Sequence, residues 1–266
     1  MKHKFYLKIV MEDFQKIYEQ DDSVNMYLDL RDLQKPEQTI LDVNFSKIKD
    51  SVFLDVGIGT GRTTYHFANI TQKYIGTDIA KAMIDGAKTN FKNDNLEFLV
   101  CDARYMSVFS DNTFDVVYFS FNGIDYINID ERILFFNEVK RICKKDALLV
   151  FSTHNLLNIK WLFDFKFSIK PIELYGNIVR YFKLRQYNKN LDKNYNDKDV
   201  IKINDGAHGY GLQTTYIKPE IQKQQLQGYG FTDIKCYGSK MGIEIDESDL
   251  KTVTDPWIYF SCLVNS

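Results

Sequence analysis

The stretch SVFLDVGIGTGRTTYHFA, residues 51–68, decides how the rest of this chain is organised. An apolar run reaches Asp55, glycines follow at the alternate positions Gly57, Gly59 and Gly61, and an amphipathic run then begins. This order predicts a strand, a tight turn and a helix. Because glycine has no Cβ and tolerates a positive φ, such a turn lets a ligand approach bare backbone beside the N–H groups that open the helix.

Two ligand classes use a turn of this kind, namely nicotinamide or flavin dinucleotides and S-adenosylmethionine. The dinucleotide fingerprint needs a glycine or alanine where this chain has Arg62, which weakens the oxidoreductase alternative. Asp55 would repel a diphosphate but would attract a ligand that carries an ammonium and a sulfonium. The stretch therefore resembles the glycine motif of class I S-adenosylmethionine-dependent methyltransferases.

The composition sets limits on class and partners. A chain of 266 residues with 44% apolar content can bury one sizeable core, which favours a one-domain α/β fold with an insertion. The net charge of -2 and the pI near 6.1 give no global reason to expect a nucleic-acid or membrane partner. The four cysteines are far apart and form no metal-binding pair, and no signal peptide or membrane-length apolar segment is predicted. These features favour a cytoplasmic protein without a metal site.

Acidic residues end three successive predicted strands. Asp78 ends KYIGTD and can accept hydrogen bonds from both ribose hydroxyls, and Asp102 follows LEFLVC at a position suited to an adenine amine. Ala103 leaves room for the flat ring. Each acid taken singly is more often a turn or a helix cap, but three of them at the same edge of a parallel sheet predict a cofactor pocket.

A fourth strand within residues 112–127 and a fifth ending at His154 and Asn155 continue the same order. Over residues 50–155 the motifs resemble class I methyltransferases, and FNGIDYI, STHN and NDGAHGYG resemble a bacterial small-molecule subfamily often linked to surface-polysaccharide genes. The resemblance implies a Rossmann-like seven-stranded α/β sheet in the order 3-2-1-4-5-7-6, with strand 7 antiparallel and a cap insertion. It implies a helical lid segment (1–45), a cofactor core (46–155), a basic cap (156–210) and the C-terminal part of the sheet (211–266).

The resemblance also implies S-adenosyl-L-methionine as the cofactor, converted to S-adenosyl-L-homocysteine. The expected cofactor contacts are Tyr27 from the N-terminal segment, Asp55, Gly57, Gly59, Gly61, Asp78, Ile79, Met83, Asp102, Ala103 and Phe119. A tyrosine such as Tyr27 is otherwise ordinary packing.

Residues 156–204 carry ten Lys or Arg against five Asp or Glu, a net charge of +5 (10 − 5). A basic cap over the mouth of the site would suit an anionic small molecule, such as a phosphorylated or sugar-nucleotide precursor. A solvated helical surface is an equally good interpretation, and the apolar run from Trp161 to Phe167 could form a homodimer contact.

Methyl transfer to a hydroxyl benefits from a base, and histidine is suited to that role. His208, in a glycine-rich loop, is the first candidate, and His154 or Asn155 would orient the acceptor. Asp125, after the fourth strand, is a third candidate, although it could equally cap a helix. A small-molecule N-methyltransferase and a non-catalytic cofactor-binding protein stay open as alternatives. A nucleic-acid amino-methyltransferase is disfavoured because SFNGID lacks the prolines that bind a flipped base.

Overall fold

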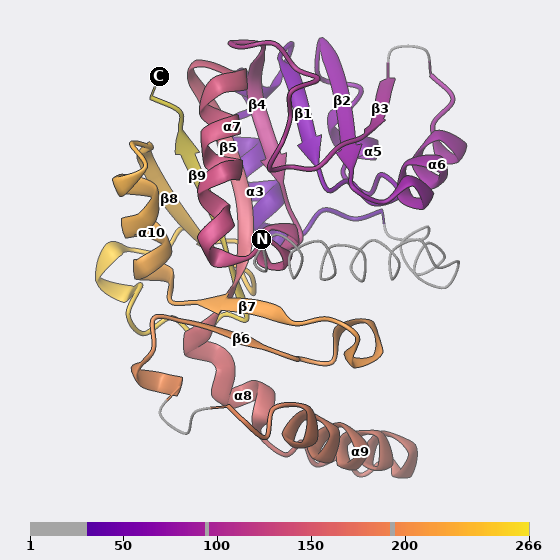
Figure 1. The fold of residues 1–266 in the computed structure, drawn as a ribbon, viewed down its shortest axis with the longest axis vertical. Coiled ribbons are helices and arrows are strands. Elements are labelled where there is room, and N and C mark those ends of the chain that lie inside the picture. Colours follow the sequence, from indigo (N-terminus) through magenta and orange to yellow (C-terminus); the bar gives the residue numbers. More distant parts are fainter. Residues whose placement is uncertain (1–30, 94–95, 192–194, 266) are drawn as a thin grey trace, which may run out of the picture.

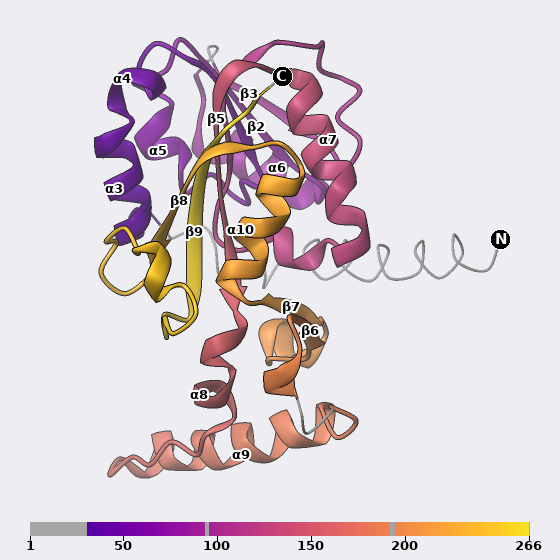
Figure 2. The ribbon, with the colours of Figure 1, turned by 90° about the vertical axis from the view of Figure 1, so that its left-hand side faces the viewer.

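The computed structural model describes residues 31–93, 96–191 and 195–265, and within them it shows a sheet covered by helices on both faces (Figure 1). Helices α3 (Lys35–Val43), α4 (Phe45–Ile48), α5 (Thr64–Phe67) and α6 (Lys81–Asn90) pack on one face. Helices α7 (Arg132–Ile142) and α10 (Pro219–Gly228) pack on the other, as the view turned by 90° shows (Figure 2). The two faces form two separate apolar layers, built from alternate residues of the same strands.

The sheet has the predicted order. Its seven core strands are β1 (Val52–Val56), β2 (Lys73–Asp78), β3 (Leu96–Val100), β4 (Phe114–Phe119), β5 (Cys143–Asn155), β8 (Thr232–Gly238) and β9 (Trp257–Leu263). They run β3-β2-β1-β4-β5-β9-β8 across the sheet, and β9 is antiparallel to both neighbours. This is the order 3-2-1-4-5-7-6 with strand 7 antiparallel, so the fold prediction is confirmed. The carboxyl ends of β1 to β4 meet at one edge, where parallel sheets bind ligands.

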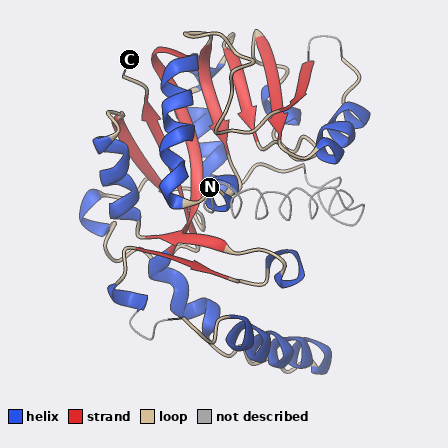
Figure 3. Ribbon diagram, viewed as in Figure 1, coloured by secondary structure: helices blue, strands red, loops and turns tan. Residues whose placement is uncertain are grey.

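The insertion after β5 forms a projecting unit rather than a closed cap on the sheet. It contains α8 (Ile159–Phe163), α9 (Pro171–Tyr187) and a hairpin of β6 (Val200–Ile203) and β7 (Thr214–Ile217). Strand β7 pairs with the last two residues of β5, through His154 and Asn155. Figure 3 shows the hairpin below the main sheet, with α8 and α9 beyond it. The hairpin therefore extends the sheet just past the end of β5.

Two helices differ in detail from the sequence analysis. The helix after the glycine turn, α5, is one turn long and begins at Thr64, so it offers only a weak dipole. The sequence pattern of α7 predicts that Ile133, Leu134, Phe136, Val139 and Ile142 face the sheet. Phe136, Val139 and Ile142 are buried as expected, but Arg132 and Phe135 are fully buried where Ile133 and Leu134 are only partly so. Arg132 is buried at the start of the helix because it pairs with the buried Asp125, as described below.

No helix in the described part of the chain is both long enough and apolar enough to cross a bilayer. The four cysteines are free thiols.

Candidate active site

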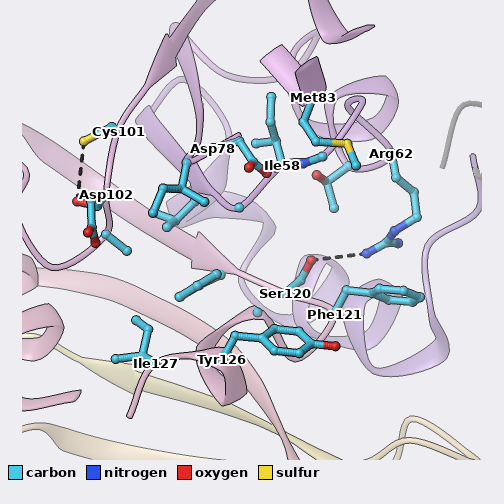
Figure 4. Close-up of a pocket in the computed structure, with 18 of the residues that line it drawn as sticks. Ile58, Arg62, Asp78, Met83, Cys101, Asp102, Ser120, Phe121, Tyr126 and Ile127 are labelled. Carbon is cyan, nitrogen blue, oxygen red and sulfur yellow. Dashed lines mark hydrogen bonds between the residues drawn. The ribbon is translucent and has the colours of Figure 1, made fainter. Parts of the chain in front are cut away.

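A pocket lies at the carboxyl ends of β1 to β4 (Figure 4). The glycine turn, the end of β2, the segment after β3 and the segment after β4 each supply part of its wall. Asp78 and Asp102 lie on one side, and Arg62 and Phe121 lie at the opposite end, with Tyr126 across the space from Ile58. The predicted contacts Gly57, Gly59, Asp78, Ile79, Met83, Asp102, Ala103 and Phe119 all line this pocket.

The glycine turn is built as the sequence predicts. Gly57 and Gly59 have φ values of 65° and 57°, which favour glycine. A Cβ on Gly57 would lie 2.7 Å from the Phe119 ring, so this glycine lets the aromatic side chain enter the pocket wall. A Cβ on Gly59 would meet nothing within 4 Å and would point into open space. Gly59 is therefore where a ligand can lie directly against backbone.

Asp78 ties the turn to the next strand. Its carboxylate accepts from the Gly59 N–H through Oδ2 at 2.9 Å and from the Ala80 N–H through Oδ1 at 2.9 Å. Burial raises the pKa of this carboxyl, while the backbone donors oppose the shift. The Ile79 N–H is a further backbone donor to this carboxylate, and since a carboxylate offers about four acceptor positions, Asp78 keeps capacity for a ligand hydroxyl.

Asp55 and Gly61 do not face the pocket, which corrects two of the expected contacts. The fully buried Asp55 carboxylate accepts from Thr63 Oγ1 at 2.5 Å and from Tyr74 Oη at 2.6 Å, behind the turn. Burial raises its pKa to about 6, although both hydroxyl donors lower it. A Cβ on Gly61 would lie 2.5 Å from the Phe91 ring, so Gly61 makes room for helix packing. Both residues support the turn, and neither lines the pocket.

Asp102 lies in the pocket wall, but an arginine that the sequence analysis did not consider holds it. Arg104 donates its backbone N–H and Nε to Oδ1 and its Nη2 to Oδ2, at 2.7–3.1 Å. The same guanidinium donates Nη1 to Glu131 at 2.7 Å. One acceptor direction of Asp102 Oδ2 is left for a ligand amine.

Arg62 forms a buried ion pair that the sequence did not reveal. Its Nη1 and Nη2 donate to Glu37 at 2.6 Å each, and Nη2 also donates to Ser120 Oγ at 3.2 Å. Its guanidinium lies 5.0 Å from the centre of the Phe121 ring. Burial opposes the charge of Arg62, but the Glu37 hydrogen bonds outweigh it and raise the pKa. The pair joins α3, the glycine turn and the end of β4, which no local pattern could predict because Glu37 is 25 residues away.

Left-handed backbone marks the segment after β4. Phe121 and Asn122 have φ values of 56° and 62°, which are strained for residues other than glycine. The Asn122 N–H donates to Ser152 Oγ at 2.7 Å, which holds this conformation. The bend brings Gly123 under the Phe119 ring, where a Cβ would lie at 2.3 Å. Strained backbone at this position is typical of a functional site.

Asp125 and His154 form a buried pair at the end of β5. Asp125 is fully buried, and its Oδ2 lies 2.6 Å from His154 Nδ1 and accepts the His154 backbone N–H at 2.7 Å. Its Oδ1 accepts from Arg132 Nη2 at 2.7 Å and from Thr153 Oγ1. Arg132 is fully buried too, and burial lowers its pKa although Asp125 opposes the shift. With four donors, every acceptor position of Asp125 is filled.

The histidine of this pair is partly open. The His154 side chain is 19% exposed and packs against the Tyr216 ring, with ring centres 4.8 Å apart. Neither Asp125 nor His154 lines the pocket itself, but Asp125 lies in the 3-10 turn η1 (Gly123–Tyr126), and Gly123 and Tyr126 of that turn do. Asn155 instead donates to the carbonyls of Val253 and Asp255, both at 2.9 Å, which fixes the chain that leads into β9.

Two expected site residues fall outside this description. Tyr27 lies outside the described residues, and so does the side chain of His208, whose backbone belongs to η5 (Ala207–Tyr210).

Comparisons with known proteins agree with this geometry. Residues 53–146 match the family described as methyltransferase domain. A curated relative, an uncharacterized protein of Methanocaldococcus jannaschii, is 27% identical over 220 residues, which cover 82% of this chain and 74% of the relative.

Solved structures share the fold at low identity. An S-adenosylmethionine-dependent methyltransferase from Mesorhizobium loti superposes with a TM-score of 0.59 at 14% identity, covering 86% of this chain and 97% of its own. The 1,6-didemethyltoxoflavin-N1-methyltransferase of Burkholderia thailandensis, solved with its substrate and S-adenosylhomocysteine, gives 0.59 at 12% identity, covering 99% and 90%. At these identities the likeness establishes the fold.

Proposed function

We propose that this S-adenosylmethionine-dependent methyltransferase transfers its methyl group to a hydroxyl of a small anionic acceptor, with His154 as the base. The observation that carries the proposal is the contact of 2.6 Å between His154 Nδ1 and the buried Asp125 carboxylate.

The pocket residues fit the cofactor. Gly59 leaves open space against the backbone, Asp78 keeps acceptor capacity for ribose hydroxyls, and the small Ala103 borders Asp102 where a flat base would lie. Phe119 and Met83 supply apolar contact area in the same wall. These side chains would hold S-adenosylmethionine, which supplies a methyl group already activated by a positive sulfur.

The Asp125–His154 pair can accept the proton of the acceptor hydroxyl. With Asp125 occupying Nδ1, a neutral imidazole carries its proton there and presents the lone pair of Nε2 as the base. The Asp125 charge stabilises the imidazolium that forms when Nε2 takes the proton. Arg132 balances the charge of Asp125 before the transfer. The pair therefore both orients the ring and stabilises its protonated form.

An anionic acceptor is supported by charge beside the pocket. Lys202 on β6 donates Nζ to Asn128 Oδ1 at 2.7 Å, and Asn128 directly follows the pocket residue Ile127. A phosphate or carboxylate on the acceptor would find this ammonium at the rim. We therefore favour phosphorylated or sugar-nucleotide metabolites, including precursors of surface polysaccharides, as the acceptors.

We also propose a cytoplasmic location. The free thiols of Cys101, Cys143, Cys236 and Cys262 suit a reducing compartment, as does the use of metabolite acceptors.

The test is a methyl-transfer screen over phosphorylated and sugar-nucleotide metabolites with methyl-labelled S-adenosylmethionine and mass spectrometry. His154→Gln should lower kcat about 100-fold or more while S-adenosylhomocysteine binding stays unchanged, because the general base acts only in the chemical step.

His66→Gln is the matched control. His66 is near the surface, and its Nε2 lies 2.6 Å from the Arg31 carbonyl, outside the pocket. It should leave both kcat and cofactor affinity unchanged. Transfer to an amine with full activity in the His154→Gln variant would favour the N-methyltransferase alternative and refute the role given to His154.

A further inference from the structure

The segment from residue 159 to residue 189, which we name the tip segment, exposes an unusual number of apolar side chains. Within the described part of the chain, nine large apolar residues in this segment are exposed to solvent, and they are Trp161, Phe165, Phe167, Ile169, Ile172, Tyr175, Ile178, Phe182 and Tyr187. Ile169 and Ile172 are 90% and 88% exposed. Contiguous exposure of this kind marks an interaction surface.

Most of the apolar side chains of α9 are exposed to solvent. Ile172, Tyr175, Val179 and Phe182 follow the spacing of one helical stripe, whereas Leu184, the buried residue of this helix, lies on another side. Figure 2 shows α9 as the outermost element at one end of the molecule, lying across the long axis. Within the described chain Ile172, Tyr175 and Phe182 of this stripe are exposed, and Val179 is partly covered.

Hydrogen bonds fix the two helices of the tip segment relative to each other. Arg180 donates to the carbonyls of Leu162 and Asp164 at 2.7 and 3.0 Å, and Arg185 donates to the carbonyl of Phe163 at 3.0 Å. These bonds satisfy the end of α8 and hold α8 and α9 together.

The tip segment is also strongly basic. It contains seven Lys or Arg and two Asp or Glu, a charge of +5, in a chain whose total is -2, so the remaining residues carry -7. Exposed lysines flank the stripe, among them Lys170 and Lys183. A basic amphipathic helix with aromatic residues is typical of binding in the plane of a membrane surface.

We propose that the tip segment docks this protein onto an anionic lipid surface, with α9 lying in the interface. A second copy of the chain suits the surface less well, because a two-fold contact would bring two segments of charge +5 together. A helix of 17 residues is about 25 Å long and roughly 10 Å wide, short of the roughly 800 Å² per partner of a stable interface. An anionic bilayer attracts each exposed Lys or Arg and accepts the apolar stripe. The docking requires no particular methyl acceptor.

The experiment is co-sedimentation of the full chain with vesicles of phosphatidylglycerol and phosphatidylcholine, compared with vesicles of phosphatidylcholine alone. We expect binding to the anionic vesicles that decreases with added salt, together with a blue shift of tryptophan fluorescence from Trp161. The double variant Ile169→Ser/Ile172→Ser should weaken binding roughly tenfold or more, and Lys170→Gln/Lys183→Gln should weaken it most at low salt. These side chains are exposed, so folding should be unaffected.

Matched controls use the opposite part of the molecule. Val43→Ser/Ile243→Ser removes apolar residues that are 61% and 64% exposed, and Lys49→Gln/Lys88→Gln removes two exposed lysines. Both should bind vesicles like the unaltered protein. No binding to anionic vesicles at low salt, or equal loss in the controls, would overturn the proposal. Sedimentation velocity tests for a dimer. If the unaltered protein is a dimer and the Ile169→Ser/Ile172→Ser variant is a monomer, the surface binds a second copy of the chain instead.

Discussion

Replacing Asp55 with asparagine should change the free energy of unfolding in a way that depends on pH. The variant should gain stability over the unaltered protein as the pH rises from acidic to neutral. Asp55 is fully buried behind the glycine turn, where Thr63 and Tyr74 donate to its carboxylate. Burial raises its pKa from 3.8 to about 6. An amide oxygen can still accept both hydroxyl donors but carries no charge.

The magnitude follows from proton linkage. A factor of ten in proton affinity corresponds to about 1.4 kcal/mol, so the shift from 3.8 to about 6 corresponds to about 3 kcal/mol. Because the folded state holds this proton more tightly than the unfolded state, the stabilisation is complete below about pH 4 and is lost as the pH rises through about 6. Asp55→Asn removes this dependence. The quantity to follow is the free energy of unfolding of the variant minus that of the unaltered protein. This difference should rise by about 3 kcal/mol between about pH 4 and about pH 7.

The assay is urea unfolding followed by far-ultraviolet circular dichroism, on both proteins and at both pH values. The difference between the two proteins at one pH is subtracted from the difference at the other pH. This subtraction removes the contributions of every other titrating group and any fixed cost of the new amide. Calorimetric titration with S-adenosylhomocysteine completes the assay. Since Asp55 does not line the pocket, the affinity should change by less than about threefold.

Two results would refute this reasoning. A difference in unfolding free energy that does not vary with pH would show that Asp55 pays no burial penalty in the folded chain. A loss of affinity by more than about tenfold would mean that Asp55 contacts the ligand, as the sequence alone indicates.

Further substitutions probe the pocket and its supports. Asp78→Ala should weaken S-adenosylhomocysteine binding at least about tenfold by calorimetry, because it removes the ribose acceptor and loosens the turn, and unchanged affinity would contradict the assignment. Arg62→Met should cost about 3 kcal/mol or more in urea unfolding because it leaves Glu37 charged and unpaired, whereas the double variant with Glu37→Gln should recover part of that loss. Gly59→Ala should cost only about 1–2 kcal/mol of stability but abolish measurable cofactor binding, whereas Gly57→Ala should lower stability further since its Cβ meets an aromatic ring. Retained binding in the Gly59→Ala variant would place the cofactor elsewhere.

Local patterns in the sequence were sufficient for the order of the elements. Strand periodicity, the alternate glycines of the turn and the proline that opens α10 each act within a few residues. They predicted the succession of strands and helices and placed Asp78 and Asp102 at one edge, because the carboxyl ends of parallel strands must meet there, whereas the order of the strands across the sheet was implied by the resemblance to class I methyltransferases.

The direction in which a side chain points at the end of a strand depends on distant partners. Asp55 turns away from the pocket because Tyr74, 19 residues later, supplies a buried hydroxyl. The sequence analysis ranked His208 ahead of His154, and what favours His154 is Asp125, which is 29 residues away along the chain. The partners of a buried ionisable side chain come from such long-range contacts. These contacts leave no periodic pattern in the sequence.

By itself the sequence determined the class of fold, the ligand-binding edge and the basic character of the insertion, because those properties follow from residue type and short spacing. Only the tertiary structure decided which acids line the pocket, which histidine is held by a carboxylate, and that α9 leaves most of its apolar side chains exposed. Each of these depends on the free energy of burying a charged or apolar group, and burial is known only once the whole chain has folded.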